Sequence, residues 1–172
     1  FGHFRFKKYL YGYLYPRIVN IPDSFERYTG VKRDIKRKGF SSGETDLSGI
    51  GFQNEWLCFQ IGRGREIWGA GQNIELALSE KSPSYDYLML GSNYGNLNVK
   101  YIHGFLESYN QINRYLIGKG FEWTNNSSFI LGLSEIVIYS GHHRNMDFGY
   151  NNPISSHLEV ELNNRLNTYG DG

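Results

Sequence analysis

The chain has 172 residues, of which 40% are hydrophobic and 16% are aromatic, with 14 tyrosines, 11 phenylalanines and 21 glycines. This bias favours strands and turns over helices. No run of about 18 apolar residues occurs, which excludes a transmembrane helix, and the lone Cys58 excludes an internal disulfide framework. The net charge of +1 is spread unevenly, with +7 over residues 1–40 and −6 over residues 41–172.

The basic segment "KRDIKRK", residues 32–38, has two interpretations. It carries the charge needed to bind nucleic acid or an anionic polymer. A solvated loop between strands is the simpler explanation, and we expect no nucleic-acid partner. The chain opens at Phe1 directly in a strand-like pattern, without an initiator Met or a signal sequence. We therefore expect a piece of a longer protein whose targeting segment is missing.

The first predicted element spans residues 1–15, where two kinds of side chain alternate. One face carries tyrosines, namely Tyr9, Tyr11, Tyr13 and Tyr15. The other face carries apolar residues, namely Phe4, Phe6, Leu10 and Leu14. This period of two predicts a strand with two different surfaces. From Pro22 to about Gly51 the sequence is polar and predicts a long loop.

Further strands and one helix follow along the chain. Residues 56–61 alternate and predict a second strand. Residues 85–90 and 97–106, joined by a turn at 92–95, predict a hairpin. Residues 127–139 are the most apolar strand candidate. Near the end, Ser156–Glu159 has the spacing of a capping box, and apolar residues recur at every fourth position, which predicts a short amphipathic helix. These residues are Ile154, Leu158, Leu162 and Leu166.

Long alternating strands rich in tyrosine and glycine, separated by polar loops, are typical of a membrane β-barrel. A soluble β-sandwich has the same alternation. Two features favour the membrane: strands of about ten residues, the length that a tilted strand needs to cross a bilayer, and tyrosines at strand ends, as in interfacial girdles. The predicted fold is all-β, an antiparallel meander forming part of a transmembrane β-barrel, one domain over residues 1–172, with a short helix near the C-terminus.

The segment "GRGREIWGAG", residues 62–71, has the glycines of a phosphate-binding loop but not their spacing. Ile67 stands where the dinucleotide pattern needs its third glycine, and no Gly-Lys-Ser/Thr follows. Glycines also permit a crowded path where a strand leaves the wall of a barrel and folds inward. We prefer this second explanation.

The sequence around this segment carries a resemblance to a known family. Residues 57–90, "LCFQIGRGREIWGAGQNIELALSEKSPSYDYLML", resemble the capsule assembly protein Wzi family, in which a strand ending in Gly-Arg runs into Trp-Gly-x-Gly and then Leu-x-Leu-Ser. Downstream, "VKYIHGFLES" resembles the next strand of the family, "RYLIGKGFEW" its Arg-Tyr-Leu turn, and "LGLSEIVIYSG" its Glu-x-x-Ile-Tyr strand. The matches cover roughly residues 52–170. Ala70 and Gly118-Lys119 depart from the pattern of the family.

The resemblance implies a bacterial outer-membrane β-barrel that binds capsular or other surface polysaccharide and assists capsule assembly. This role is lectin-like and requires neither catalysis nor a cofactor. The implied partners are the polysaccharide and outer-membrane lipid. Five or six strands cannot close such a barrel without an unpaired edge in lipid, so a fragment of the complete barrel is expected.

Six residues are predicted to bind carbohydrate or to form a network in the lumen of the barrel: Arg63, Arg65, Glu66, Trp68, Glu135 and Tyr139. Trp68 offers a flat apolar face on which a sugar ring can stack. Of the two roles, we favour packing of the lumen by paired charges over direct ligand contact.

Glu135 is in phase with Phe129, Leu131 and Leu133, and a carboxylate facing lipid is costly. Either a bulge at Ser134–Glu135 turns it inward, or this whole face points inward. We expect Arg63 or Arg65 as its partner.

A soluble β-rich carbohydrate-binding or glycoside-hydrolase domain is the alternative. Several carboxylates are available for such an enzyme: Glu107, Glu122, Glu135, Glu159 and Glu161. Nothing in their spacing selects a catalytic pair, so we expect no enzyme activity. His142, His143, Asp147 and His157 meet no metal-binding spacing, and we expect no metal there. Cys58 is expected to pack rather than to act as a nucleophile.

Overall fold

The computed structural model of the protein describes residues 1–25, 28–30, 32–33, 40–68, 78, 82–146 and 150. Within these residues there are eight strands and one turn of 3-10 helix, η1 (Pro22–Ser24). The strands are β1 (Gly2–Phe6), β2 (Leu10–Val19), β3 (Ser42–Gln53), β4 (Leu57–Gly64), β5 (Tyr85–Tyr94), β6 (Leu97–Tyr109), β7 (Ile112–Thr124) and β8 (Ile130–His142). The predicted all-β class is confirmed.

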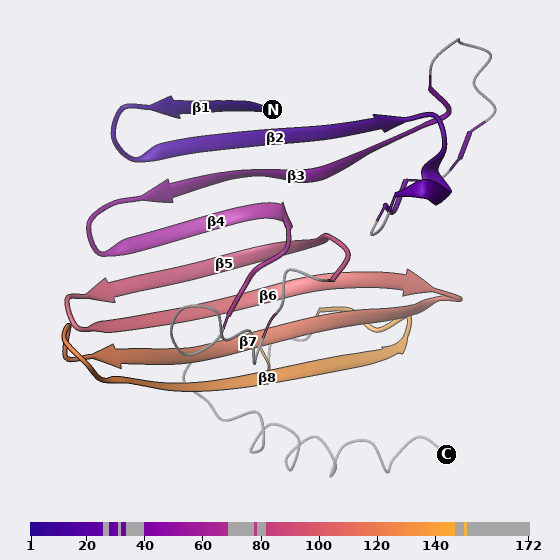
Figure 1. Ribbon diagram of the computed structural model, residues 1–172. Helices are drawn as coiled ribbons and strands as arrows, with labels where there is room; N and C mark the ends of the chain where they lie inside the picture. Colours follow the sequence, from indigo (N-terminus) through magenta and orange to yellow (C-terminus); the bar gives the residue numbers. More distant parts are fainter. Residues whose placement is uncertain are drawn as a thin grey trace, which may run out of the picture.

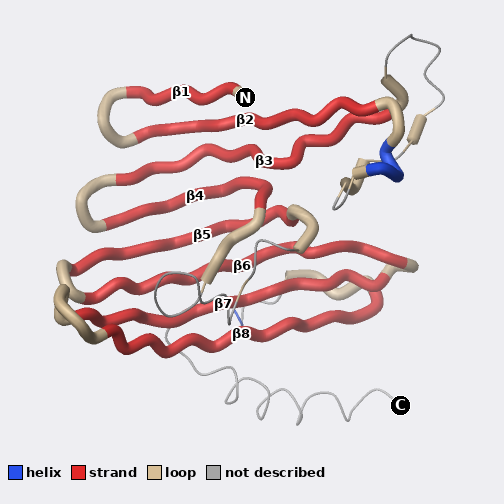
Figure 2. The backbone as a smooth tube through the Cα atoms, viewed as in Figure 1, coloured by secondary structure: helices blue, strands red, loops and turns tan. Residues whose placement is uncertain are grey.

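The strands form one antiparallel sheet in which the spatial order is the chain order, from β1 to β8 (Figure 1). This is the predicted meander. The turns β1–β2, β3–β4, β5–β6 and β7–β8 lie at one end of the sheet, which we call the turn end (Figure 2). The longer β2–β3 and β4–β5 connections lie at the opposite end, which we call the loop end. Among the described residues, no helix is long and apolar enough to cross a membrane.

The strand register gives the sheet two different faces, because successive residues of a strand point to opposite sides. One face, which we call the apolar face, carries exposed hydrophobic side chains on all eight strands. They include Phe4, Phe6, Leu10, Leu14, Ile50, Ile61, Leu90, Val99, Phe121 and Leu133. The opposite face, which we call the tyrosine face, is centred on Tyr11, Tyr13, Gln60, Tyr85 and Tyr87.

Residues 1–15 do not form the single strand that alternation predicts. A turn at residues 7–9 divides them into β1 and β2, and Lys7 has a φ of 52° there. The predicted faces are nevertheless correct within the two strands, since Phe6 pairs with Leu10 and Phe4 pairs with Gly12. The paired residues are an even number of positions apart in the sequence. Even-numbered residues of both strands therefore point to one face of the sheet, and odd-numbered residues point to the other. Tyr9 is the exception, because it lies in the turn and stacks on Phe52 of the apolar face at 5.8 Å.

The predicted loop from Pro22 to about Gly51 is too long. Residues 42–51 belong to β3, which pairs with β2 on one side and β4 on the other. The sequence of β3, "SGETDLSGIGFQ", has few of the branched and aromatic residues that mark a strand. Its backbone pairs with two neighbouring strands, and this pairing overrides its weak propensity.

The predicted hairpin of residues 85–90 and 97–106 is confirmed by β5 and β6. The Arg-Tyr-Leu segment, residues 114–116, lies inside β7 rather than in a turn. In β8 no bulge occurs at Ser134–Glu135, because the register with β7 is continuous from Ile130 to His142. Glu135 therefore stays on the same face as Leu133. The predicted helix around residues 154–166 lies outside the described residues.

The centre of β6 and β7 is buried from both sides. Ile102 and Ile117 are completely buried, although they point to opposite faces. Trp68 and Leu78, from the β4–β5 connection, cover Ile102 on the tyrosine face. Tyr150, which follows β8, packs with Ile117 on the apolar face. The sheet therefore has two local cores, one on each side of the same strands.

Candidate functional site

The tyrosine face is organised around the side-chain amide of Gln60, which is 8% exposed. The hydroxyl of Tyr11 donates to Gln60 Oε1 at 2.5 Å, and Gln60 Nε2 donates to the hydroxyls of Tyr13, at 3.1 Å, and Tyr87. The amide thus ties together three tyrosines from β2 and β5. A satisfied polar network of this kind fixes its members in one arrangement.

Glycines make room for these tyrosine rings. A Cβ atom at Gly49 would stand 2.9 Å from the hydroxyl of Tyr13, and one at Gly62 would stand 3.2 Å from it. Both distances are shorter than ordinary van der Waals contact. Gly62 is one of the glycines that made the segment "GRGREIWGAG" conspicuous in the sequence. A Cβ at Gly62 would also stand 2.5 Å from the carbonyl oxygen of Ser48, so this glycine leaves room for the backbone of β3 as well as for Tyr13.

Trp68 lies on the tyrosine face after the chain leaves β4. Its backbone exchanges two hydrogen bonds of 3.0 Å with Leu78, which closes a small β-bridge within the connection. Its ring packs against the backbone of β7, where a Cβ at Gly118 or Gly120 would come within 3.0 or 2.9 Å of it. Trp68 is half-buried. The ring is therefore held in place while part of it is accessible.

Glu66 and Lys100 form an ion pair beside Trp68, with Lys100 Nζ 2.8 Å from Glu66 Oε2. Their side chains are 17% and 27% exposed. The backbone N–H of Glu66 also donates to the hydroxyl of Tyr85 at 3.4 Å. Glu66 thus connects the β4–β5 connection to both β5 and β6. Aromatic faces and charged hydrogen-bonding groups lie together here, which is the chemistry that binds a polyhydroxylated ligand.

Arg65 belongs to a different cluster, at the loop end. Its guanidinium pairs with Asp46, and its Nε donates to the carbonyl of Ser82 at 2.9 Å. Asp46 is 4% exposed and also lies 3.1 Å from Arg17, which in turn pairs with Glu44. Two carboxylates and two guanidinium groups therefore compensate one another at low exposure. Sequence analysis missed Arg17, Glu44 and Asp46, since only the pairing of β3 with both β2 and β4 brings them to Arg65.

The other three predicted site residues lie on the apolar face. Arg63 pairs with Asp86 at 3.0 Å across β4 and β5. Glu135 pairs with Lys119 at 3.4 Å across β7 and β8. The expectation that Glu135 pairs with Arg63 or Arg65 is therefore wrong. Register decides the outcome, since Lys119 stands directly opposite Glu135 whereas the arginines pair with residues of β5 and β3.

Tyr139 sits in an aromatic cluster on the apolar face near the loop end. Its hydroxyl lies 3.0 Å from His103 Nε2, and its ring stacks between Tyr115 at 5.0 Å and Tyr150 at 4.8 Å. The guanidinium of Arg144 lies 4.8 Å from the same ring. The six predicted residues therefore do not form one network. Glu66 and Trp68 share the tyrosine face, Arg65 is at the loop end, and the rest are on the apolar face.

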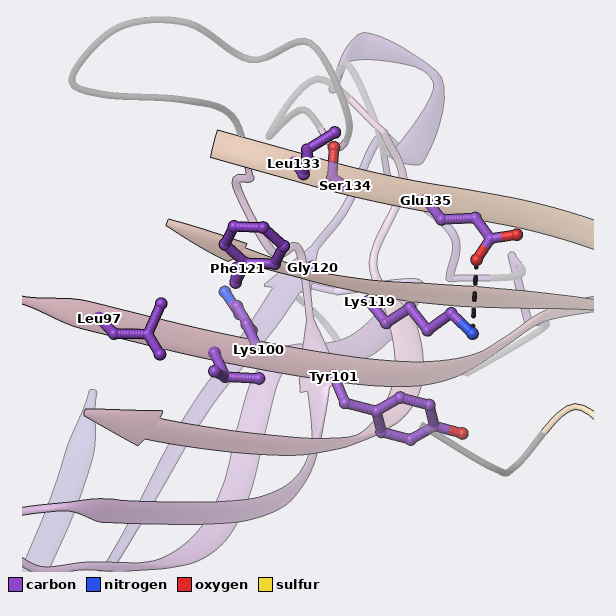
Figure 3. Close-up of a pocket in the computed structure, with 10 residues that line it drawn as sticks. Leu97, Lys100, Tyr101, Lys119, Gly120, Phe121, Leu133, Ser134 and Glu135 are labelled. Atoms are coloured by element: carbon purple, nitrogen blue, oxygen red, sulfur yellow. Dashed lines mark ion pairs between the residues drawn. The ribbon is translucent and has the colours of Figure 1, made fainter. Parts of the chain in front are cut away.

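A groove of about 580 Å³ runs along the apolar face. Figure 3 shows Phe121 and Leu133 on its walls and the Lys119–Glu135 pair at one end. In the part of the chain that the structure describes, Glu135 is the one carboxylate that lines this groove, whereas a glycosidase uses two.

The other residues considered as catalytic or metal-binding candidates include Glu107 and the His and acidic residues near the C-terminus. Glu107 is paired with Arg114 at 2.5 Å. In the part of the chain that the structure describes, no three His, Cys, Asp or Glu residues gather where they could hold a metal ion. Asp147, His157, Glu159 and Glu161 lie outside that part.

The class that the fold defines is an antiparallel meander sheet with one apolar face and one hydrogen-bonded tyrosine face. A scan against protein-family models, a search of curated proteins and a search of solved structures each found no match to the chain.

Proposed function

We propose that the chain is a section of the wall of an outer-membrane β-barrel that binds surface polysaccharide and assists capsule assembly without catalysing a reaction. The observation that carries the proposal is the division of one meander sheet into an apolar and a polar face. A transmembrane barrel needs this division, since its strands alternate between lipid and lumen. The resemblance of residues 52–170 to the Wzi family supplies the ligand class.

The apolar face supports contact with lipid. Phe4, Ile50 and Leu133 are each 59–62% exposed on β1, β3 and β8. A row of large apolar side chains open to water across a whole sheet is unfavourable. In lipid the same side chains are in a matching environment.

Aromatic residues at the turn end give further support. Three of the four hairpins carry exposed aromatic side chains on the apolar face there, namely Tyr9, Tyr94, Trp123 and Phe129. Trp and Tyr favour the interface between membrane and water. The strand β7 has 13 residues. At about 3.3 Å per residue and a tilt of about 45°, it spans roughly 28 Å, close to the thickness of a bilayer core.

The tyrosine face supports a lumen that binds glycan. Its polar atoms are satisfied within the wall around Gln60, while Trp68 and the Glu66–Lys100 pair remain partly open. A sugar ring has an apolar face for stacking and hydroxyls for hydrogen bonds. The site around Trp68 supplies partners for both.

Fractionation of the complete protein in its host tests the proposal. We expect it in the outer-membrane pellet, with a gel mobility that changes on heating, as a closed barrel gives. Retention of the surface polysaccharide by the purified protein, and its reduction by Trp68→Ala, tests the ligand. Recovery in the soluble fraction would overturn the membrane assignment.

One observation favours the soluble alternative, a β-rich carbohydrate-binding domain. Lys119, Glu135 and His103 are polar groups near the middle of the apolar face. Such groups are costly in lipid but ordinary in a soluble protein whose second layer covers the sheet. Recovery of the complete protein in the soluble fraction with its polysaccharide bound would support this alternative.

A further inference from the structure

A second cleft lies on the tyrosine face at the turn end, about where the β3–β4 and β5–β6 hairpins meet. Its volume is about 300 Å³, at the small end of the range for ligand pockets. The residues that define it are Gln53, Trp56, Cys58, Met89, Gly91, Asn98 and Lys100. None of them is among the six site residues predicted from the sequence, and of these residues the cleft shares Lys100 with the site around Trp68.

Four side-chain amides surround this cleft, and they divide into two pairs. Asn54 Oδ1 accepts the backbone N–H groups of Trp56 and Leu57, and Asn93 Oδ1 accepts that of Gly95. These two amides stabilise the β3–β4 and β5–β6 turns. In the described part of the chain, the side-chain amides of Gln53 and Asn98 make no hydrogen bond within the protein. Two donor–acceptor groups are thus available to a ligand.

Trp56 forms the rim of the cleft and is 51% exposed. Its backbone is fixed on both sides. Its N–H donates to Asn54 Oδ1 at 3.0 Å, and its carbonyl accepts from Asn93 N at 2.8 Å and Ser92 Oγ at 2.9 Å. The two hairpins are therefore joined at the residue that presents an open aromatic ring. The backbone that carries the ring is thus ordered before a ligand stacks on it, which lowers the entropy cost of binding.

The floor of the cleft is small and open. A Cβ added at Gly91 would meet nothing closer than Cys58 Cβ at 3.7 Å, an ordinary contact. The only cation that lines the cleft in the described residues is Lys100, which is already paired with Glu66. An acidic ligand would have no free counter-charge here. A neutral ligand with several hydroxyl groups suits the two amides and the ring.

We propose that this cleft binds one neutral hexopyranose residue, stacked on Trp56 and hydrogen-bonded to Gln53 and Asn98. The choice of a sugar rests on the proposed glycan-binding function, but not on insertion into a membrane. The site is a second contact for the same polysaccharide, at the opposite end of the tyrosine face from the Arg65–Asp46 cluster.

Cys58 provides the readout, because it lines the cleft and is the single cysteine of these 172 residues. The complete protein is prepared with any cysteine outside these residues replaced by serine. The alkylation rate of Cys58 by N-ethylmaleimide is measured with glucose, galactose, mannose or glucuronate at concentrations on the order of ten times a millimolar Kd. We expect at least one neutral hexose to slow alkylation severalfold and glucuronate to have no effect. Equal protection by glucuronate, or protection by no hexose, overturns the proposal.

Two variants separate a specific site from general occlusion. Gly91→Leu fills the cleft and should abolish hexose binding, measured by saturation-transfer NMR. Gly43→Leu is the matched control, since a Cβ at Gly43 also meets nothing closer than 3.7 Å and lies on β3 away from the cleft. Unchanged hexose binding in Gly91→Leu would overturn the site. If polysaccharide retention depends on Trp68 while hexoses leave Cys58 unprotected, only this inference fails and the proposed function stands.

Discussion

Lys119 and Glu135 stand directly opposite each other on β7 and β8, with Nζ 3.4 Å from Oε2, on the same face as the exposed Phe121 and Leu133. A single charge on this face would be costly in lipid or beneath a second protein layer. The facing partner lowers that cost without any change in the strand register. This pair explains why β8 needs no bulge.

Removal of one member of this pair should destabilise the protein more than removal of both. The side chains are 12% and 38% exposed, so we expect Lys119→Met to lower the free energy of unfolding by about 1–3 kcal/mol, between the values for surface and buried pairs. The double variant Lys119→Met/Glu135→Leu should recover most of this loss. Urea unfolding of the refolded complete protein measures both. Additive losses would show that the pair has no coupling.

Gln60→Leu should destabilise the protein by about 1–3 kcal/mol, because it leaves the hydroxyls of Tyr11, Tyr13 and Tyr87 without their common partner. Gln53→Leu is the control, since Gln53 is an exposed glutamine on the same face. The measurement is the denaturant midpoint of unfolding of each variant, which should be lower for Gln60→Leu than for Gln53→Leu. Equal midpoints would show that the tyrosine network contributes nothing to stability.

Gly118→Ala should displace the ring of Trp68. The new Cβ would stand 3.0 Å from that ring and 2.7 Å from Ile136 Cδ1, so neighbouring side chains must move. We expect a loss of about 1–3 kcal/mol in stability, as in other overpacked sites, together with a red shift in tryptophan fluorescence. Gly43→Ala should produce neither change. A normal spectrum in Gly118→Ala would contradict the close packing of Trp68 on β7.

Trp68→Ala should weaken polysaccharide binding by roughly fivefold, equivalent to about 1 kcal/mol of lost stacking, while the protein still folds. Trp123→Ala is matched in size but lies on the opposite face at the turn end. It should leave polysaccharide binding unchanged. Retention on immobilised polysaccharide is the measurement. Equal effects of the two substitutions would remove Trp68 from the binding site.

Asp46→Ala should be the most destabilising of these substitutions. It leaves Arg17 and Arg65 next to each other without the carboxylate between them, and breaking a buried pair costs about 3–5 kcal/mol. Thermal unfolding of the variant tests this expectation. Asp86→Ala is the control, since Asp86 is 59% exposed in its pair with Arg63. A similar loss of stability in both variants would show that the buried cluster stabilises the protein no more than the exposed Arg63–Asp86 pair does.

Sequence pattern predicted the fold class and the composition of the two faces, because alternation reports side-chain direction whatever the strand pairs with. The same pattern missed β3, whose strand conformation depends on its two neighbours rather than on its own residues. The glycine-rich segment of residues 62–71, together with the family resemblance, placed Glu66 and Trp68 in the candidate site, whereas alternation alone did not. Alternation could not find Asp46 as the partner of Arg65, because the two residues are 19 positions apart and meet only through the register.

The strict chain order of the sheet has a consequence for how the protein forms and how its relatives can vary. Each of the eight described strands pairs only with its sequence neighbours, so each hairpin can close locally before the next one is made. A hairpin removed from or added to such a sheet leaves all other pairings in place. Variation in size should therefore occur in steps of two strands, with the rest of the wall unchanged.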